Sequence, residues 1–347
     1  MRSQQLRFGW FIPTAGDTTA IGDPSADDPP GMEMFERVAL AAEEAGFEYA
    51  LVPVQTACYE AWISCAMIVA KTRRLKMLVA ARPGFMSPTL TAKMISTFDQ
   101  LSQGRICINL IAGGGAAEMG ADGCFLDHDE RYEVMDETVT LMKRVWTEAD
   151  PVTHEGKHFR VENARVLPVP YQKPYPEFFL GGMSNAAREI SAKHADVHLF
   201  WGDTPDQIAR DIADISARAR NHGRSNQLGF GMRLQIIVRE NEQDAWDAAD
   251  ALIASASDNL KNMISNLWEQ SESNTRMKEL GQRDDLKIAP HLWSGITTVR
   301  PGAGVAVVGN PEQVADTLQQ FVDIGCSNFC LSGYPHDKAA VLRRKHY

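Results

Sequence analysis

An arginine and a glutamine lie on one face of a strand-like run and could bind an anion. Arg233 and Gln235 interrupt the otherwise apolar run Leu228–Val238, and residues two apart on a strand point the same way. An arginine inside a folded core is costly unless it meets an anion. The same spacing also fits a solvent-facing Arg–Gln pair or an arginine paired with a buried carboxylate, so these alternatives stay open.

A tyrosine and a histidine near the end of the chain have the same spacing. Tyr334 and His336 follow the apolar run Ser327–Leu331 and could donate protons or anchor an anion, although a histidine in a turn is more often only solvated. Arg300 precedes a Pro-Gly-Ala-Gly turn and is either a second cation for this site or an ordinary surface residue. Cys58 could be a reactive thiol or a hydrogen-bond donor, with a buried inert cysteine as the default.

A glycine-rich segment joins a strand-like run to a helical pattern and could bind phosphate. It reads Gly181-Gly182-Met183-Ser184-Asn185. Glycines let the backbone approach an anion closely, and the first N–H groups of a helix are free to bind one. Ser184 could add a hydroxyl donor, or could simply cap the helix after a tight turn.

These residues need a scaffold that brings strand ends together, and the sequence predicts one. Short β-rich runs alternate with longer amphipathic patterns to the end of the chain, which predicts a parallel sheet. Eight such strands favour closure into a TIM (β/α)8 barrel, whose active site lies at the carboxyl ends of the strands. The expected strands are Arg7–Ile12, Tyr49–Pro53, Leu75–Ala81, Ile106–Ile111, Glu177–Gly181, Val197–Trp201, Leu228–Val238 and Ser327–Leu331. The expected helices are Met34–Ala45, Leu90–Gln103, Asp129–Trp146, Asn185–His194, Pro205–Gly223, Pro311–Gly325 and Asp337–Lys345.

We expect residues 1–347 to form a single barrel domain in which two segments interrupt the alternation. Pro151–Pro176 is rich in proline and should form a long connection over the barrel mouth, or a small hairpin. Residues 241–300 form a longer insertion, helical at Asp244–Ala254 and Asn259–Trp268 and then charged at Arg276–Lys287. Long loops on the carboxyl-terminal face of a barrel commonly act as lids.

Composition narrows the classes of partner. The 347 residues are 44% hydrophobic and carry a net charge of −10, which argues against nucleic acid but not against an anionic substrate held by a few local arginines. No apolar run of about 18 residues is present, which predicts no membrane span, and the polar start Met1–Phe8 is unlike a signal peptide. Six scattered cysteines without C-x-x-C spacing predict reduced thiols in a cytoplasmic protein and no metal site.

Eleven short motifs, distributed over almost the whole chain, carry a family resemblance. They are Trp10–Thr14, Ala57–Trp62, Ser87–Thr89, Leu101–Arg105, Phe125–His128, Glu130–Glu133, Gly181–Ser184, Trp201–Asp203, Arg233–Leu234, Ala303–Gly309 and Leu331–His336. In this order the motifs resemble the luciferase-like two-component flavin monooxygenases. The last motif is specific to the alkanesulfonate monooxygenase branch of that family.

The resemblance implies a bacterial-luciferase-like barrel that uses reduced FMN, supplied by a separate NAD(P)H-dependent flavin reductase. With O2, such an enzyme cleaves the C–S bond of an organosulfonate and releases sulfite and an aldehyde. The resemblance also implies a homo-oligomer, either a dimer or a tetramer. The segment Trp293–Gly304 would be part of a lid that shuts water out.

The resemblance also assigns roles to individual residues. Arg233 and Arg300 would hold the sulfonate, and Trp201 would wall the substrate pocket. Tyr334 and His336 would bind the anion or move a proton, and Cys58 would lie near the reactive face of the flavin. The implied FMN contacts are Asn109, Ala112, Tyr132, Gly181, Gly182 and Ser184.

The chain departs from the simple alkanesulfonate pattern at two positions. Ala15 and Gln235 stand where that pattern has histidines, so two ionisable groups are missing and Gln235 offers a neutral donor and acceptor. This fits a hydroxylated substrate such as the sugar sulfonate sulfoquinovose as well as it fits a plain alkane chain. Two other functions stay open: a deazaflavin-dependent oxidoreductase of the same fold, and a non-catalytic flavin-binding protein.

Overall fold

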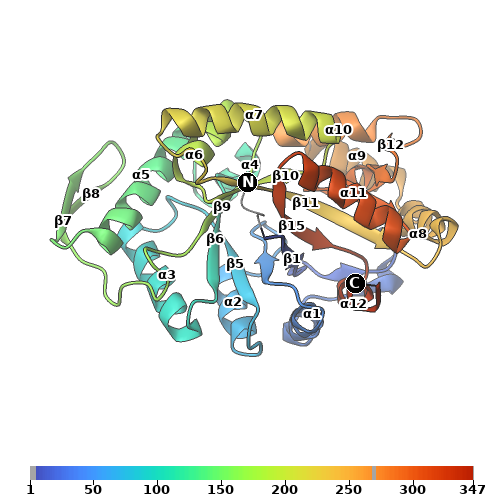
Figure 1. Ribbon diagram of the computed structural model, residues 1–347, viewed down its shortest axis with the longest axis horizontal. Helices are drawn as coiled ribbons and strands as arrows, with labels where there is room; N and C mark the ends of the chain where they lie inside the picture. Colours follow the sequence, from blue (N-terminus) through green and yellow to red (C-terminus); the bar gives the residue numbers. More distant parts are fainter. Residues whose placement is uncertain (1–4, 268–270, 347) are drawn as a thin grey trace.

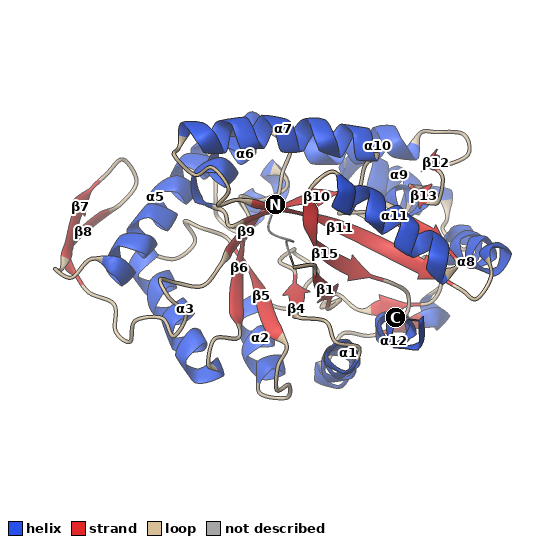
Figure 2. Cartoon of the chain, in the orientation of Figure 1, coloured by secondary structure: helices blue, strands red, loops and turns tan. Residues whose placement is uncertain are grey.

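Eight parallel strands close into a barrel in the computed structural model, which describes residues 5–267 and 271–346 (Figures 1 and 2). In sheet order the strands are β10 (Val197–Trp201), β9 (Phe178–Leu180), β6 (Ile106–Leu110), β5 (Lys76–Ala81), β4 (Tyr49–Val52), β1 (Arg7–Phe11), β15 (Cys326–Ser332) and β11 (Gly229–Val238). Strand β11 pairs again with β10, which closes the ring. The predicted TIM barrel and its eight strands are therefore confirmed.

One helix follows each barrel strand and packs on the outside of the ring (Figure 2). These helices are α1 (Met32–Glu44), α2 (Ala61–Val69), α3 (Pro88–Ser102), α5 (His128–Thr147), α6 (Asn185–His194), α7 (Pro205–Asn221), α11 (Pro311–Asp323) and α12 (His336–His346). Several begin at caps that the sequence displays. Asp127 and Glu130 form a capping box at the start of α5, and Asn310 and Gln313 form one at the start of α11.

Helix α2 was not among the predicted helices, and its composition explains why. Its nine residues, AWISCAMIV, are apolar on almost every side, so they lack the polar face that marks a helix by its 3.6-residue period. One face, including Cys65 and Ile68, is buried against the barrel, whereas Ile63 and Met67 on the other face are exposed. Tertiary packing rather than an amphipathic pattern therefore fixes this helix.

The barrel lumen is filled by side chains rather than open. Inward-pointing residues form one buried cluster: Phe11, Tyr49, Leu51, Leu78, Cys107, Phe179, Val197, Leu199 and Cys330. Gly9 makes room for it, because a Cβ at Gly9 would lie 2.1 Å from the Tyr49 ring. Below the cluster Arg7 closes the amino-terminal end, with Nε 3.0 Å from Glu48 and Nη2 2.8 Å from Glu177. A reaction site can therefore lie only at the opposite, carboxyl-terminal mouth.

The insertion after β11 contains three strands that extend the sheet beyond the closed ring, and we call this extension the branch. The last four residues of β11 pair in parallel with β14 (Ala306–Gly309), outside the ring, and β14 continues into β13 (Leu292–Trp293) and β12 (Lys287–Ala289) in antiparallel pairing. This three-strand extension was not predicted. Between the branch strands lie α8 (Glu242–Ala254), α9 (Asp258–Leu267), α10 (Glu272–Gly281) and the 3-10 helix η3 (Gly295–Thr298).

The insertion matches the sequence expectation in part. The first two predicted helices are present as α8 and α9, and the residue Trp268 at the end of the second lies outside the described residues. The charged stretch Arg276–Lys287 was not predicted to be helical, yet its first six residues end α10. Charged residues on a partly exposed helix gave little apolar periodicity from which to predict it.

The proline-rich segment Pro151–Pro176 contains a small hairpin, β7 (Val152–Glu155) and β8 (Arg160–Ala164). Figure 1 shows the hairpin beside α5, on the outside of the barrel. The Glu137 carboxylate of α5 accepts hydrogen bonds from the His154 ring and from the backbone N–H groups of His158 and Phe159. The expectation of a hairpin is correct, whereas the expectation of a connection over the mouth is wrong, because these bonds tie the segment to a helix.

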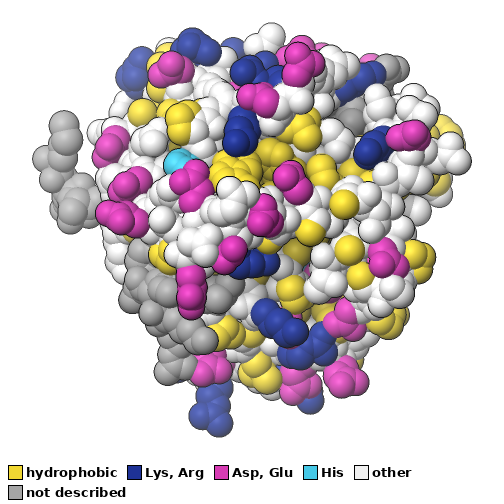
Figure 3. Space-filling model, turned by 90° about the vertical axis from the view of Figure 1, so that its right-hand side faces the viewer, with side chains coloured by type: hydrophobic (Ala, Val, Ile, Leu, Met, Phe, Trp, Pro, Cys, Tyr) yellow, Lys and Arg dark blue, Asp and Glu magenta, His cyan; other side chains and the backbone are white. Residues whose placement is uncertain are grey.

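Short elements complete the described chain. They are β2 (Asp17–Thr18), β3 (Asp27–Asp28), the 3-10 helix η1 (Pro24–Ala26) and α4 (Ala116–Ala121). On the face shown in Figure 3, acidic and basic side chains surround hydrophobic ones that gather near the centre. Within residues 5–267 and 271–346 no helix has the length and apolar character to cross a membrane, and no three His, Cys, Asp or Glu side chains are grouped as metal ligands.

Candidate active site

A cavity of about 180 Å³ opens at the carboxyl ends of β6, β9 and β10, and we call it the mouth cavity. Eight of the predicted site residues line it: Asn109, Ala112, Tyr132, Gly181, Gly182, Ser184, Trp201 and Arg233. The first six are all the residues predicted to contact a cofactor. Residues far apart in sequence are thus brought together at the edge where a parallel barrel gathers its strand ends.

Two helix N-termini face the mouth cavity. Ser184 caps α6 by accepting a hydrogen bond from the Ala187 N–H at 3.2 Å, and its side chain also hydrogen-bonds the Tyr132 hydroxyl. Ser271 caps α10 in the same way from Asn274, and residues 271–274 line the cavity too. Free N–H groups and the positive end of each helix dipole favour a phosphate at such a place. The contribution of α10 was missed, because the sequence of the insertion did not reveal where it packs.

The glycine pair between β9 and α6 is required by its surroundings. A Cβ at Gly181 would lie 2.6 Å from the Leu199 carbonyl oxygen on the neighbouring strand. Gly182 has φ +136°, and a Cβ there would lie 2.8 Å from the Ala187 side chain and 3.4 Å from the Tyr132 hydroxyl oxygen. No other residue type can make this turn without displacing those groups. The backbone therefore forms part of the cavity wall.

Arg131 holds the opposite wall in place. It is buried, and it donates hydrogen bonds from Nε to the Ala112 carbonyl at 2.8 Å and from Nη1 to the Leu126 carbonyl at 2.9 Å. These bonds fix the loop that follows β6, where Ala112 and Gly113 line the cavity. Sequence reasoning did not single out Arg131, although it lies within the motif Glu130–Glu133.

Two arginines meet on one aromatic ring beside the mouth cavity, and we call Arg233 and Arg300 the arginine pair. Their guanidinium carbons lie 4.6 Å and 5.4 Å from the centre of the Phe11 ring. Arg233 is 6% exposed and donates from Nη1 to the Ser332 hydroxyl and the Leu234 carbonyl. Arg300 donates from Nη1 to the Tyr334 hydroxyl at 2.7 Å.

The arginine pair has no counter-ion among the described residues, since no carboxylate there lies within 4 Å of either guanidinium. Burial lowers the pKa of Arg233, and the nearby charge of Arg300 lowers it further. Two positive charges held together in this way are unfavourable unless an anion joins them. Planar guanidinium groups offer paired N–H donors that suit an oxyanion with several oxygens.

Gln235 lies behind Arg233 instead of facing the mouth cavity. It has no exposed surface, its Oε1 accepts a hydrogen bond from the Ser332 hydroxyl, and its Nε2 donates to the Ala303 carbonyl at 3.1 Å. Both of its polar groups are therefore occupied within the protein. This geometry does not favour a direct contact with substrate hydroxyl groups. It ties the strand that carries Arg233 to the loop that follows Arg300.

His336 forms a buried pair with Asp17, a residue that sequence reasoning did not select. Its Nδ1 lies 2.7 Å from Asp17 Oδ1, and its backbone N–H donates to Asp17 Oδ2 at 2.7 Å. Both side chains are 1% exposed. The His336 ring contacts the Tyr334 ring edge-on at 5.2 Å and the Phe11 ring at 5.8 Å. The histidine therefore lies on the same aromatic ring as the arginine pair.

Cys58 and Trp201 complete the predicted set. Cys58 is half-buried, and burial raises the pKa of its thiol, so it stays protonated and can act as a donor. Trp201 lies across from Arg233 in the β10–β11 register and lines the mouth cavity. Ala15 is exposed in the loop after β1. Arg233 both lines the mouth cavity and lies on the Phe11 ring, which Arg300 and His336 also contact.

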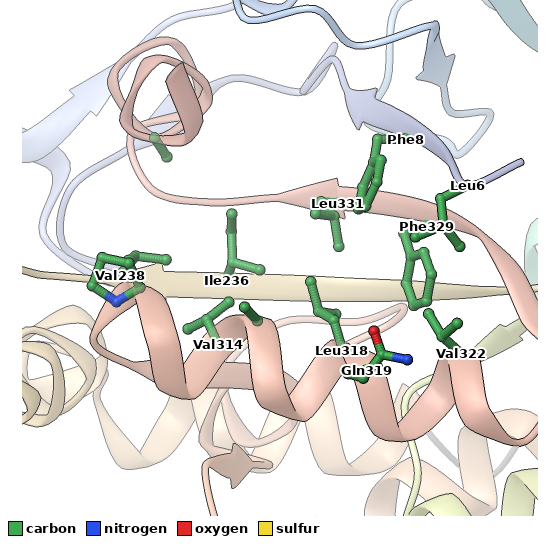
Figure 4. Close-up of a pocket in the computed structure, with 13 residues that line it drawn as sticks. Leu6, Phe8, Ile236, Val238, Val314, Leu318, Gln319, Val322, Phe329 and Leu331 are labelled. Carbon is green, nitrogen blue, oxygen red and sulfur yellow. The ribbon is translucent and has the colours of Figure 1, made fainter. Parts of the chain in front are cut away.

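A larger cavity of about 250 Å³ lies elsewhere, between α11 and the outward faces of β11 and β15 (Figure 4). Figure 4 shows apolar side chains directed into it from the helix and the strands, including Val314, Leu318, Phe329 and Leu331. Gln319 is the one polar side chain among the residues that line it. Without an acid, a base or a nucleophile in its lining, this cavity does not compete as a reaction site.

Comparisons with known proteins agree with the barrel fold described above. A sequence model of the family described as luciferase-like monooxygenase matches residues 6–328. A riboflavin lyase, solved with modified FMN and riboflavin, is 18% identical and has a TM-score of 0.81, with 99% of this chain and 92% of that chain covered. An EDTA monooxygenase from Chelativorans sp. BNC1 is 17% identical with a TM-score of 0.76, covering 98% and 92%. An F420-dependent secondary alcohol dehydrogenase is 15% identical with a TM-score of 0.67, covering 97% and 96%.

Proposed function

Since this chain belongs to the luciferase-like monooxygenase family, we propose that it is a reduced-FMN-dependent monooxygenase that cleaves the C–S bond of an organosulfonate. The products are sulfite and an aldehyde, and the co-substrate is O2. The observation that carries this proposal is the arginine pair, which brings two guanidinium groups to one ring without a carboxylate partner among the described residues.

In this proposal the mouth cavity holds FMN, with the phosphate at the helix N-termini. Its two helix N-termini and the glycine turn at Gly181 and Gly182 suit a phosphate dianion, with Ser184 and Tyr132 adding hydroxyl groups. Asn109 and Ala112 line the wall towards β6. Reduced FMN, delivered by a separate NAD(P)H-dependent reductase, would supply the electrons that activate O2 there.

In this proposal the arginine pair binds the sulfonate and places the neighbouring carbon beside the mouth cavity. Tyr334, whose hydroxyl accepts from Arg300, holds that guanidinium in position. Trp201 forms the wall shared by the two regions, and the Cys58 thiol is a neutral donor. Because Gln235 is engaged behind Arg233, its difference from the alkanesulfonate pattern changes the support of the arginine rather than the shape of the pocket.

We propose that the insertion over residues 241–300 acts as the lid. A bidentate ion pair joins it to the barrel: Arg276 of α10 places Nε 2.6 Å and Nη2 3.0 Å from the two carboxylate oxygens of Asp203. Met277 of the same helix packs beside Trp201 and Asp203 at the edge of the mouth. A closed lid keeps water from the reacting groups.

We further propose that the chain forms a homo-oligomer through the outer face of α2. Ile63 is 69% exposed and Met67 51% exposed, and Tyr59 just before the helix is 51% exposed. A helix that is apolar on all sides is ordinarily buried, and a second copy of the chain would cover it. Light scattering after gel filtration should give a dimer or tetramer, and Ile63→Glu should shift the protein towards a monomer.

Sulfite release is the experiment that tests the proposed function. Purified protein, FMN, NADH and a generic flavin reductase are incubated in air with methanesulfonate, octanesulfonate, taurine and sulfoquinovose in turn. Sulfite from one class of substrate supports desulfonation and ranks alkane against sugar. No sulfite from any of them, with flavin reduced and O2 present, rejects it in favour of another oxygenation or of a deazaflavin-dependent reaction. Weak binding of oxidised FMN with tight binding of reduced FMN separates the enzyme from a flavin-storage protein.

A further inference from the structure

The pair formed by Asp17 and His336 fixes where the histidine carries its proton. The Asp17 carboxylate accepts three hydrogen bonds, from the His336 ring Nδ1, the His336 backbone N–H and the Thr18 backbone N–H. An ionised carboxylate can only accept. The ring proton of a neutral His336 must therefore sit on Nδ1, which leaves Nε2 with a free lone pair.

That lone pair has no partner within the described part of the chain. His336 Nε2 is buried and makes no hydrogen bond there, although His336 has 1% exposure overall. The Trp10 indole N–H, which also approaches the histidine, donates to its backbone carbonyl and leaves the ring free. An acceptor without a partner, beside two guanidinium groups that have no carboxylate partner among the described residues, fits a ligand that brings both an anion and a proton.

The charges around the ring keep it neutral. Burial lowers the pKa of His336, Asp17 opposes that effect, and the guanidinium groups of Arg300 and Arg233 lower the pKa again. Tyr334 is the other titratable group in contact with the ring, edge-on at 5.2 Å. A neutral imidazole near pH 7 can accept a proton, as a base in this position must.

We propose that His336 Nε2 accepts the proton that the substrate loses when its C–S bond breaks, and that Asp17 is the positioning residue that holds His336 in the required tautomer. The proposal rests on the proposed function, which supplies an oxygenated carbon bearing both a hydroxyl and the sulfonate. The hydroxyl proton passes to Nε2, and the O–H electron pair becomes the second bond of the aldehyde carbonyl. The C–S electron pair leaves with sulfite, so atoms and charge balance without a further oxidant.

This step can be measured without flavin or O2. Aldehyde–bisulfite adducts are the same hydroxysulfonates, so the adducts of octanal and of glyceraldehyde are supplied directly under nitrogen and sulfite release is followed with a thiol-reactive dye. The wild-type protein should accelerate adduct breakdown over buffer. Because burial and the arginine pair lower the pKa of His336, the rate should hold at the ordinary histidine value of about 6.5 and fall only at a lower pH, where protonated Nε2 cannot accept.

Asp17→Asn is the informative variant. Asp17 Oδ1 accepts from both the Thr18 N–H and His336 Nδ1, and Oδ2 accepts from the His336 backbone N–H. One amide oxygen cannot serve all three donors, so the variant no longer fixes the ring proton on Nδ1. We expect adduct breakdown to fall in Asp17→Asn, by at most the roughly 10²–10⁴-fold that a general base usually contributes. His336→Gln should show the full fall, and the double variant should fall no further than His336→Gln. Asp337→Asn is the matched control, since Asp337 is the next residue but pairs with Arg37 on α1, and it should keep wild-type rates.

The tautomer of the His336 ring can be measured directly by ¹⁵N NMR. If Asp17 had only a structural role, replacing it would not change this tautomer. In protein labelled with ¹⁵N-histidine, the signals lost in His336→Gln identify the ring, and they should show a protonated Nδ1 and a bare Nε2. Asp17→Asn should lower the fraction of protein that carries the ring proton on Nδ1. A proton on Nε2 in the wild-type protein overturns the proposal, even if Asp17→Asn fails to fold. So does adduct breakdown no faster than buffer, even if the full reaction releases sulfite from a sulfonate.

Discussion

Arginines lie over aromatic rings at both ends of the barrel lumen, and the two ends differ in how the positive charge is balanced. At the amino-terminal end Arg7 lies about 6 Å from the Tyr49 and Phe179 rings and pairs with Glu48 and Glu177. At the carboxyl-terminal end the arginine pair lies on Phe11 with no carboxylate partner among the described residues.

The pKa values of the arginines follow the same division. Burial would lower the pKa of Arg7, but the hydrogen bond and charge of Glu177, with the charge of Glu48, raise it above its ordinary value. Burial lowers the pKa of Arg233, and Arg300 adds to the effect. The charge of Arg7 is therefore balanced by carboxylates of the protein itself, whereas in the proposed function an anionic ligand would balance the arginine pair. An arginine's neighbours, rather than its burial, distinguish a structural role from a binding role.

The largest effect should come from removing the buried member of the arginine pair. Arg233→Ala should abolish desulfonation and weaken sulfonate binding by about 2–5 kcal/mol, the usual loss for one partner of a buried charge contact. Binding of reduced flavin should remain largely intact, because the mouth cavity keeps its glycine turn and helix ends. Calorimetry with the sulfonate and anaerobic flavin titration measure the two separately. Surviving desulfonation would show that the anion binds elsewhere.

A carboxylate placed behind Arg233 should make the carboxyl-terminal end of the lumen resemble the amino-terminal end, where carboxylates balance Arg7. In Gln235→Glu the new charge would lie beside Ser332 and neutralise the arginine, so the Kd for sulfonate should rise about 10–100-fold, or about 1.4–2.7 kcal/mol. Gln235→Met, which breaks the same hydrogen bonds without adding charge, is the matched control and should weaken binding less. Equal effects in the two variants would mean that Gln235 acts through loop position alone.

Removing the arginine at the amino-terminal end of the lumen should lower the stability of the protein and leave its catalytic activity unchanged. Arg7→Met leaves Glu48 and Glu177 facing each other, and their partial exposure places the expected loss of unfolding free energy at about 1–3 kcal/mol. This lies between a surface pair and a fully buried one. Urea unfolding measures the loss, and the KM for sulfonate should stay at the wild-type value. A changed KM would show that the two ends of the lumen are coupled.

The smallest effect should appear without any mutation. An anion that binds the arginine pair at the carboxyl-terminal end of the lumen stabilises the folded state by about 1.4 kcal/mol at a concentration ten times its Kd. Sulfate or a short alkanesulfonate should therefore raise the Tm of the wild-type protein and of Arg7→Met, but not that of Arg233→Ala. Chloride at equal ionic strength is the control, because general screening acts on all three proteins alike. A rise of equal size in Arg233→Ala would place the anion outside the arginine pair.

The sequence predicted the barrel because strand and helix periods are local signals. The eight strands were placed within one or two residues, and with them Arg233 and Trp201, which the structure finds in register on adjacent strands. Helix α2 and the strands of the sheet branch were missed, because an all-apolar helix has no contrasting face and strands of two to four residues have no measurable period.

The residues that position the site residues could not be predicted from local sequence patterns. Asp17 meets His336 across 319 residues, and α10 reaches the mouth only through the way the insertion folds. The role of Gln235 likewise depends on contacts with Ser332 and Ala303. Single residues with suitable chemistry can be selected from sequence, whereas their partners follow from tertiary packing.

The branch in the sheet has a consequence for how this enzyme can change over evolutionary time. The segment between β11 and β14 is attached outside the closed ring, by hydrogen bonds from the last four residues of β11. Residues can be gained or lost there without altering the pairing that closes the barrel or the turn beside Ser184. Arg300 lies in this replaceable segment and Arg233 in the fixed ring. If the proposed anion site is correct, new substrates can be acquired by remodelling the part that holds Arg300 while the part that holds Arg233 is inherited unchanged.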